Sequence, residues 1–216
     1  MHFEIYVEDA SGKKFLDLVI PMIFGSEHTF KVHSYKGIGH IPKNMKKPED
    51  ASKRILLENL PKILKGQGRT FQGYRDEYKA AVVILCDLDK KCLKQFRQEL
   101  LNILEQCDPK PETAFCIAVE EMEAWLLGDV NAIKKAYPKA KTNILVSYEN
   151  DSICDTWERL ADAVYTGGAT KLLGKGWQTV GREKSVWAEK ITPHLNINDN
   201  KSQSFQYFVK KLLSLI

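Results

Sequence analysis

The sequence lacks the features of a secreted, membrane-spanning or disulfide-stabilised protein. Its five cysteines are odd in number and include no Cys-x-x-Cys pair, which argues against a disulfide framework and a zinc site. No apolar run approaches the roughly 20 residues of a membrane-spanning helix, and no signal-peptide pattern is present. We therefore expect a cytoplasmic protein in which Cys86 and Cys116 are small core residues.

The chain also lacks a strong net charge, a sequence repeat and any low-complexity segment. Its 216 residues carry 32 Lys and Arg against 28 Asp and Glu, a net charge of +4. Such a mild balance is compatible with a nucleic-acid partner, but it is more typical of a solvated, lysine-rich surface. The length is enough for one α/β domain or for a domain with a modest appendage, and the hydrophobic content of 44% supports a real core.

Apolar runs and helical periodicity alternate along the first part of the chain. The predicted strands are Phe3–Val7, Phe30–Tyr35, Ala80–Asp87 and Thr113–Val119. Between them we predict a helix capped by Ser11, one over about 48–64 and one over 90–107. Such alternation predicts an α/β fold with a central, mostly parallel four-stranded sheet flanked by helices over residues 1–128. Residues 129–216 are predicted to form a helical extension packed on the same domain.

Acidic side chains follow three of these predicted strands. Asp87 and Asp89 close the most apolar one, and both carboxylates point to one side if the strand geometry continues through them. Parallel strands bring their carboxyl ends to one edge, where open α/β sheets bind ligands. The other acidic residues expected at this edge are Glu8, Glu120, Glu121 and Glu123.

Several carboxylates at one edge cannot all stay ionised without a cation. One or two Mg²⁺ or Mn²⁺ ions are the economical solution, and such a site serves phosphoryl transfer or phosphodiester hydrolysis. If a helix begins at Glu120, then Glu120 and Glu123 share one face. The plainer alternative is a favourable interaction of these glutamates with a helix dipole. A positive charge for the transition state is expected from Lys171, Lys175, Arg182 or Lys184.

Two glycine-containing segments are further candidates for contact with a substrate. Lys36–Lys47 combines glycines with basic side chains and favours, weakly, a polymeric phosphate substrate, although most such loops are simply solvated. The segment 167–181 does not match the spacing of a Walker motif. Within it, Gly174–Trp177 is predicted to be a mobile loop over a site.

The motifs resemble a known fold family. Val7-Glu8-Asp9, Cys86-Asp87-Leu88-Asp89 and the acidic cluster after the next strand look like a Toprim domain. Over nearly the whole chain, the sequence resembles the Toprim-like domain-of-unknown-function family 4276. The motifs that carry this closer resemblance are Glu123-Ala-Trp-Leu-Leu-Gly-Asp129, His194-Leu195 and Ser202-Gln-Ser-Phe205. One departure is that Asp9, not the usual glycine, follows Glu8.

The resemblance implies a Mg²⁺- or Mn²⁺-dependent endonuclease acting on DNA or RNA. It further implies a prokaryotic anti-phage defence system with an AAA- or ABC-type ATPase partner. By this resemblance Glu8 is the general acid/base or a metal ligand, Asp87 and Asp89 are metal ligands, and Glu123 is a further ligand or orienting residue. We count Glu120 among the expected metal ligands and Lys184 among the expected catalytic side chains.

Two other functions are compatible with the same fold. One is a catalytically silent regulatory or binding subunit of an ATPase complex. The other is a metal-dependent phosphatase or nucleotidyltransferase. The intact acidic set, with Glu8, Asp87 and Asp89 all present, favours the nuclease.

Overall fold

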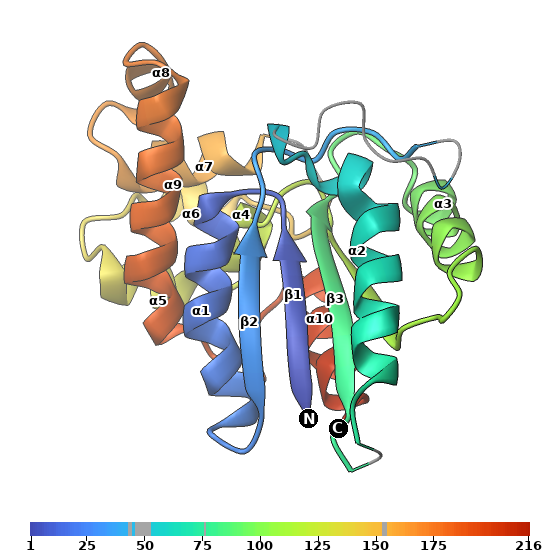
Figure 1. Ribbon diagram of the computed structural model, residues 1–216. Helices are drawn as coiled ribbons and strands as arrows, with labels where there is room; N and C mark the ends of the chain where they lie inside the picture. Colours follow the sequence, from blue (N-terminus) through green and yellow to red (C-terminus); the bar gives the residue numbers. More distant parts are fainter. Residues whose placement is uncertain (43–44, 46–52, 76, 153–154) are drawn as a thin grey trace.

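A four-stranded parallel sheet with the strand order β2-β1-β3-β4 forms the centre of the protein (Figure 1). The computed structural model describes residues 1–42, 45, 53–75, 77–152 and 155–216. The strands are β1 (His2–Val7), β2 (Thr29–Ser34), β3 (Ala80–Asp87) and β4 (Thr113–Ala118). The predicted α/β class and parallel sheet are therefore confirmed.

The strands place alternate side chains on opposite faces of the sheet, as the period of an extended chain requires. In β3, Ala81, Val83 and Leu85 belong to the hydrophobic cluster on one face, and the intervening residues belong to the cluster on the other face. Burial on both faces explains why β3 is an almost unbroken apolar run.

Helices cover both faces of the sheet. One face packs against α2 (Leu56–Gln72) and α3 (Leu93–Glu105). The other face packs against α1 (Ala10–Phe24) and helices that follow β4. These later helices are α4 (Glu123–Leu127), α5 (Val130–Ala136), α6 (Thr142–Val146), α7 (Thr156–Val164), α8 (Gly168–Leu173), α9 (Trp177–Ile191), the 3₁₀ helix η2 (Thr192–His194) and α10 (Gln203–Leu213). In Figure 1, α9 lies beside α1, and α10 lies behind the strands.

Buried polar contacts hold the C-terminal segment against the sheet. The indole Nε1 of Trp125 donates a hydrogen bond of 2.8 Å to Ser204 Oγ. The side-chain amide of Asn200 donates a hydrogen bond of 2.7 Å to the Trp125 carbonyl oxygen. Gly128 lies against Asn200, because a Cβ added at Gly128 would sit 2.1 Å from Asn200 Oδ1. A side chain at this position is therefore excluded by direct contact.

Asp129 extends this clamp to the next turn of the chain. Its carboxylate caps α5 by accepting a hydrogen bond of 2.9 Å from the Ala132 amide. Its second oxygen accepts a hydrogen bond of 2.8 Å from the Asn196 amide. The stretch from Trp125 to Asp129, which carries much of the family resemblance, thus fixes the helical extension on the sheet.

The start predicted near residue 48 for the second helix lies outside the described residues, and α2 begins at Leu56. The loop predicted at Gly174–Trp177 coincides with the turn between α8, which ends at Leu173, and α9, which begins at Trp177. Its mobility and its position over a site stay predictions. Within the described part of the chain, no helix is long and apolar enough to cross a membrane.

Candidate functional site

A small cleft opens at the carboxyl ends of β1 and β3, between these strands and α9. Its polar lining includes Glu8, Asp9, Asp87, Glu123 and Lys184. The strands are paired in register, with Val7 of β1 opposite Leu85 of β3, so the side chains that follow them meet at one edge. The cleft therefore brings together four of the side chains predicted for the site, Glu8, Asp87, Glu123 and Lys184.

Backbone hydrogen bonds fix the position of Glu8. The Tyr35 amide donates a hydrogen bond of 2.9 Å to the Val7 carbonyl, and the Gly37 amide donates one of 2.8 Å to the Glu8 carbonyl. Gly37 adopts a φ of +113°, which favours glycine at this position. The basic loop that begins at Lys36 therefore starts directly beside Glu8, whereas its Lys43, Lys46 and Lys47 lie outside the described residues.

Glu8, which is partly buried, and Asp87, which is buried, form a carboxyl pair. Burial, together with the charges of Asp9 and Asp89, raises the pKa of Glu8 to about 7, and a hydrogen bond with Asp87 opposes the rise. Burial and the neighbouring Glu8 also hold the pKa of Asp87 well above its usual range. Glu8 Oε2 is buried and has no hydrogen-bond partner in the described residues. The pair therefore shares a proton unless a cation is bound.

Lys184 provides positive charge on the opposite side of the cleft. Its Nζ lies 3.0 Å from Glu123 Oε2 and 3.8 Å from Glu121 Oε2. Glu123 Oε2 has no hydrogen-bond partner of regular geometry within the described residues, so its contact with Lys184 Nζ is an ion pair. Burial lowers the pKa of Lys184, but the Glu123 and Glu121 carboxylates outweigh burial and raise it above its usual value. Burial raises the pKa of Glu123 to about 7, and the Lys184 ammonium opposes this rise. Because Lys184 Nζ and Glu123 Oε2 are only 3.0 Å apart, both partners are charged.

Asp89 lies at the margin of the cleft. β3 ends at Asp87, and Asp89 adopts a positive φ of 49°, so the extended geometry expected through both aspartates does not continue. The Asp89 side chain is 50% exposed and forms an ion pair of 2.9 Å with Lys91. Asp89 is nevertheless near enough for its charge to raise the pKa of Glu8.

Glu120 does not join the carboxylates of the cleft. It adopts a positive φ of 67° immediately after β4, and α4 begins only at Glu123. Its Oε2 accepts a hydrogen bond of 3.1 Å from the Thr156 amide in the first turn of α7. The expected helix from Glu120 onward is therefore wrong, and Glu120 faces α7 instead of the position of a metal ligand.

Asp9, not Ser11, caps α1, which corrects the predicted helix start. Asp9 accepts a hydrogen bond of 2.7 Å from the Gly12 amide and one of 2.6 Å from the Ser11 hydroxyl. A Cβ added at Gly12 would lie 2.5 Å from Val7 Cγ2, so a glycine is needed where the turn passes the end of β1. Asp9 after Glu8 thus starts the helix and leaves Glu8 in the cleft.

Sequence analysis missed one acidic residue near the cleft and undervalued another. Glu158 of α7 has a buried Oε2 without a hydrogen-bond partner in the described residues, and burial raises its pKa. Its charge interacts with Lys184 and Glu123. Glu121 was counted only as part of an acidic cluster, although it forms an ion pair with Lys184. The helical pattern around Glu158 carries no signal that this helix reaches the sheet edge.

A protein-family model described as Domain of unknown function (DUF4276) matches residues 7–213. The chain belongs to this family. The matched range includes every residue of the cleft, so the DUF4276 fold itself assembles it. Neither a search of curated proteins nor a search of solved structures finds a match.

The donor set of the DUF4276 cleft suits a hard divalent cation with open positions. Across the described ranges, no group of three or more His, Cys, Asp or Glu side chains is arranged to hold a metal ion as it stands. Mg²⁺, however, is commonly held by only one or two carboxylates, with water and substrate phosphate as its other ligands. Glu8 and Asp87, with the unpaired Glu8 Oε2 and the half-exposed Asp89 nearby, match that requirement.

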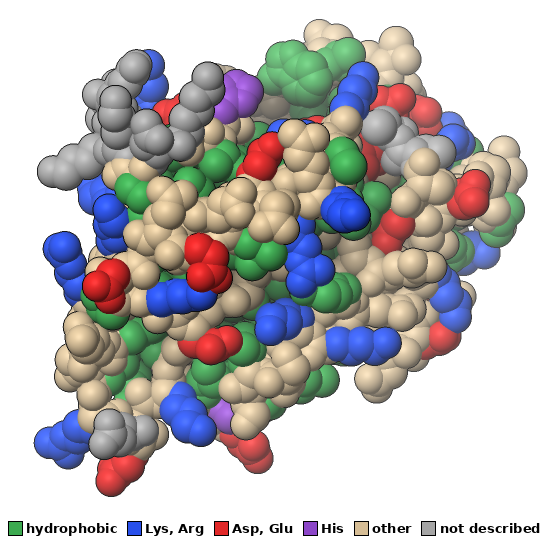
Figure 2. Space-filling model, turned by 90° about the vertical axis from the view of Figure 1, so that its right-hand side faces the viewer, with side chains coloured by type: hydrophobic (Ala, Val, Ile, Leu, Met, Phe, Trp, Pro, Cys, Tyr) green, Lys and Arg blue, Asp and Glu red, His purple; other side chains and the backbone are tan. Residues whose placement is uncertain are grey.

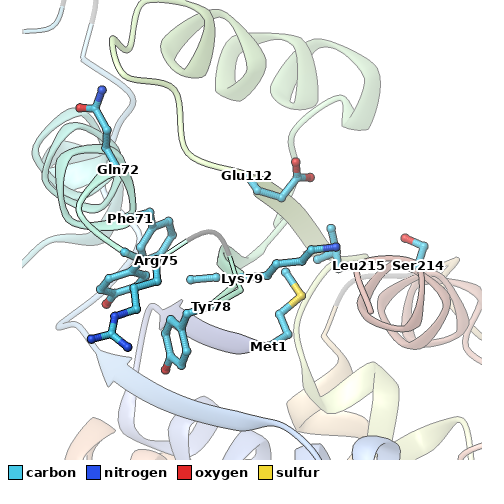
Figure 3. A pocket seen from close by; sticks show the side chains of 11 residues that line it. Met1, Phe71, Gln72, Arg75, Tyr78, Lys79, Glu112, Ser214 and Leu215 are labelled. Carbon is cyan, nitrogen blue, oxygen red and sulfur yellow. The ribbon is translucent and has the colours of Figure 1, made fainter.

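Other surfaces of the DUF4276 protein have a different character. Figure 3 shows a pocket at the amino-terminal edge of the sheet, lined by Met1, Phe71, Tyr78, Lys79 and Leu215 among others. That pocket lies at the opposite end of the strands from Glu8 and Asp87. On the side of the molecule that carries α3, basic side chains are interspersed with acidic ones (Figure 2). Neither surface resembles the carboxyl pair.

Proposed function

We propose that this DUF4276 protein is a Mg²⁺- or Mn²⁺-dependent nuclease of Toprim type, which hydrolyses phosphodiester bonds of DNA or RNA. The observation that carries the proposal is the carboxyl pair of Glu8 and Asp87 at the carboxyl edge of a parallel sheet, in which the buried Glu8 Oε2 has no hydrogen-bond partner among the described residues. Such a pair needs a cation to be fully ionised at neutral pH. The resemblance of the three acidic motifs to Toprim domains favours phosphodiester cleavage over other metal-assisted reactions.

In this proposal, Glu8 and Asp87 hold the cation, with Asp89 as a further ligand from the margin of the cleft. The bound cation supplies charge neutralisation at the phosphate and lowers the pKa of a water molecule. Before a cation binds, the Glu8 carboxyl holds a proton near neutral pH, because its pKa is raised to about 7, and this proton would leave when Glu8 becomes a ligand. Lys184 offsets one of the two negative charges of Glu121 and Glu123 and thereby reduces the repulsion of an anionic substrate by these carboxylates.

A polymeric substrate is supported by the loop that starts beside Glu8. The Tyr35 amide donates a hydrogen bond to the Val7 carbonyl at the end of β1. The next residue, Lys36, therefore lies close to the cleft. Basic side chains next to such a site position phosphates without reading sequence. We further propose that the protein acts in the cytoplasm, in anti-phage defence with an ATPase partner, as the Toprim resemblance implies.

A catalytically silent DUF4276 subunit is the second candidate. It is favoured by the absence, across the described ranges, of three side chains already arranged around a metal position. It is also favoured by the ion pair between Asp89 and Lys91, which partly occupies one expected ligand. A silent subunit of this kind gains no thermal stability from divalent cations, whereas a metal-binding nuclease does.

The test is cleavage of plasmid, single-stranded DNA and tRNA by the purified chain, with Mg²⁺, Mn²⁺ or a chelator. We expect metal-dependent cleavage that is lost in Asp87→Ala and in Asp89→Ala. Asp17→Ala is the matched control, because Asp17 lies on the exposed side of α1 in an ion pair with Lys13. Cleavage that is equal in the wild type and both site variants would remove the catalytic assignment.

A further inference from the structure

Lys184 lies on the buried stripe of an amphipathic helix. In α9, Val180, Trp187 and Ile191 are buried in the core, and Lys184 falls on the same face by its spacing of three or four residues. α9 packs along α1 (Figure 1), and α1 starts at Ala10, directly after the cleft residues Glu8 and Asp9. A lysine on such a stripe is costly unless a carboxylate pairs with its ammonium. The position therefore requires an anion at this place in the cleft.

Ion-pair contacts divide the acidic side chains near Lys184 into two groups. Its Nζ lies 3.0 Å from Oε2 of Glu123, a side chain that is only 2% exposed, and 3.8 Å from Glu121 Oε2. Glu8 and Asp87, the carboxyl pair, form no ion pair with Lys184 among the described residues. The charges of Glu8, Lys184, Glu123 and Glu121 all act on the Asp87 carboxyl, so Asp87 is near both groups.

This division bears on how many cations the cleft can hold. A two-metal site places its ions roughly 4 Å apart, with a shared carboxylate between them and further ligands on each side. Asp87, which is near both groups, is the candidate for the shared carboxylate, and Glu8 is the candidate ligand on one side. The ligands on the other side would be Glu121 and Glu123, and these are the carboxylates that already face a positive charge.

We propose that the Lys184 ammonium takes the place of a second cation, so that the cleft binds one divalent ion, through Glu8 and Asp87. Glu123 is then a positioning residue that holds Lys184, and not a ligand of the metal. This inference rests on the proposed function, because it presupposes a cation at the carboxyl pair. It differs from a purely structural reading, in which the ion pair only tethers α9 and has no influence on metal binding.

The number of bound ions separates these readings. The full-length chain, stripped with a chelator, is titrated with Mn²⁺, and bound ions are counted by calorimetry and by electron paramagnetic resonance. The wild type is expected to bind one Mn²⁺ per chain, and Lys184→Met two, because Glu121 and Glu123 become free to bind. Lys190→Met, which removes a positive charge from an exposed position of the same helix, is the matched control and is expected to bind one.

Two further variants place the ion. Glu123→Gln is expected to keep one Mn²⁺, and Asp87→Asn is expected to bind none. Two ions in the wild type, or one ion in a folded Lys184→Met, would overturn the inference. If Lys184→Met does not fold, Lys184→Gln, which removes the charge but keeps a hydrogen-bond donor toward Glu123, is counted in its place, and one ion in this folded variant would equally overturn the inference. A wild type that binds no ion would remove the metal site itself, and with it the proposed function.

Discussion

Replacement of Glu8 by glutamine is predicted to stabilise the metal-free protein at alkaline pH. The buried Glu8 carboxyl has its pKa raised from 4.5 to about 7, chiefly by burial. The folded protein therefore holds a proton that the unfolded chain releases between about pH 4.5 and pH 7. Because the folded state binds more protons across this window, stability falls as pH rises through it, and the loss is complete above pH 7. The glutamine side chain of the variant has no charge to bury and can donate a hydrogen bond to Asp87.

The size of the effect follows from the shift in the pKa. Each pH unit corresponds to about 1.4 kcal/mol, so a rise from 4.5 to about 7 corresponds to about 3 kcal/mol. For a chain of this length, 1 kcal/mol moves the melting temperature by about 2–4 °C. We therefore expect Glu8→Gln to melt roughly 6–12 °C above the wild type at pH 8.5 in the presence of a chelator. At pH 4.5, where the Glu8 carboxyl is protonated in the folded state, the difference is expected to vanish.

Thermal denaturation across about pH 4.5 to 8.5 measures this directly. Glu189→Gln is the control, because Glu189 is an exposed residue whose carboxylate faces Lys14 across the surface. Saturating Mg²⁺ should raise the melting temperature of the wild type at about pH 8.5 and leave that of Glu8→Gln almost unchanged. A Glu8→Gln variant that, in the presence of a chelator at alkaline pH, melts at or below the wild-type temperature would refute this prediction. The charged Glu8 carboxylate would then not destabilise the folded protein.

Three further predictions concern the framework that holds the site. Asp9→Ala removes the N-cap of α1 and is expected to cost about 1 kcal/mol in chemical denaturation, with Asp9→Asn close to the wild type; equal stability of all three would contradict the assigned cap. Ser204→Ala leaves the buried Trp125 indole without its acceptor and should cost about 1–3 kcal/mol; a loss below that of an exposed serine variant would argue against the clamp. Gly128→Ala should cost about 1–3 kcal/mol by overpacking against Asn200 and the Ser202 backbone nitrogen; unchanged stability in thermal denaturation would contradict this close contact.

The strands of this fold could be predicted closely because each has a strong local signal. β3 is buried on both faces, so its apolar run is nearly unbroken, and its predicted span of Ala80–Asp87 agrees with the structure. The helices of the second half were harder, because glycines dominate the segment before α9. α8 forms there despite the glycines, since Ala169 and Leu172 are buried in the core.

Sequence alone could predict only those site residues that the sheet topology brings to one edge. Glu8 and Asp87 follow paired parallel strands, so their proximity is a consequence of topology. The orientation of Glu120 depends on a positive φ and on the distant Thr156 amide, neither of which has a sequence signal. Lys184 was one of four basic candidates, and only the packing of α9 on α1 selects it.

The most direct test of a cation at the carboxyl pair is the anomalous scattering of Mn²⁺ in crystals of the wild-type protein grown above the pKa of Glu8. The account predicts a single peak at about 2 Å from carboxylate oxygens of both Glu8 and Asp87, with Lys184 still paired to Glu123. A cleft without a peak at saturating Mn²⁺, or a peak bound by Glu121 and Glu123 with Lys184 displaced, would contradict it.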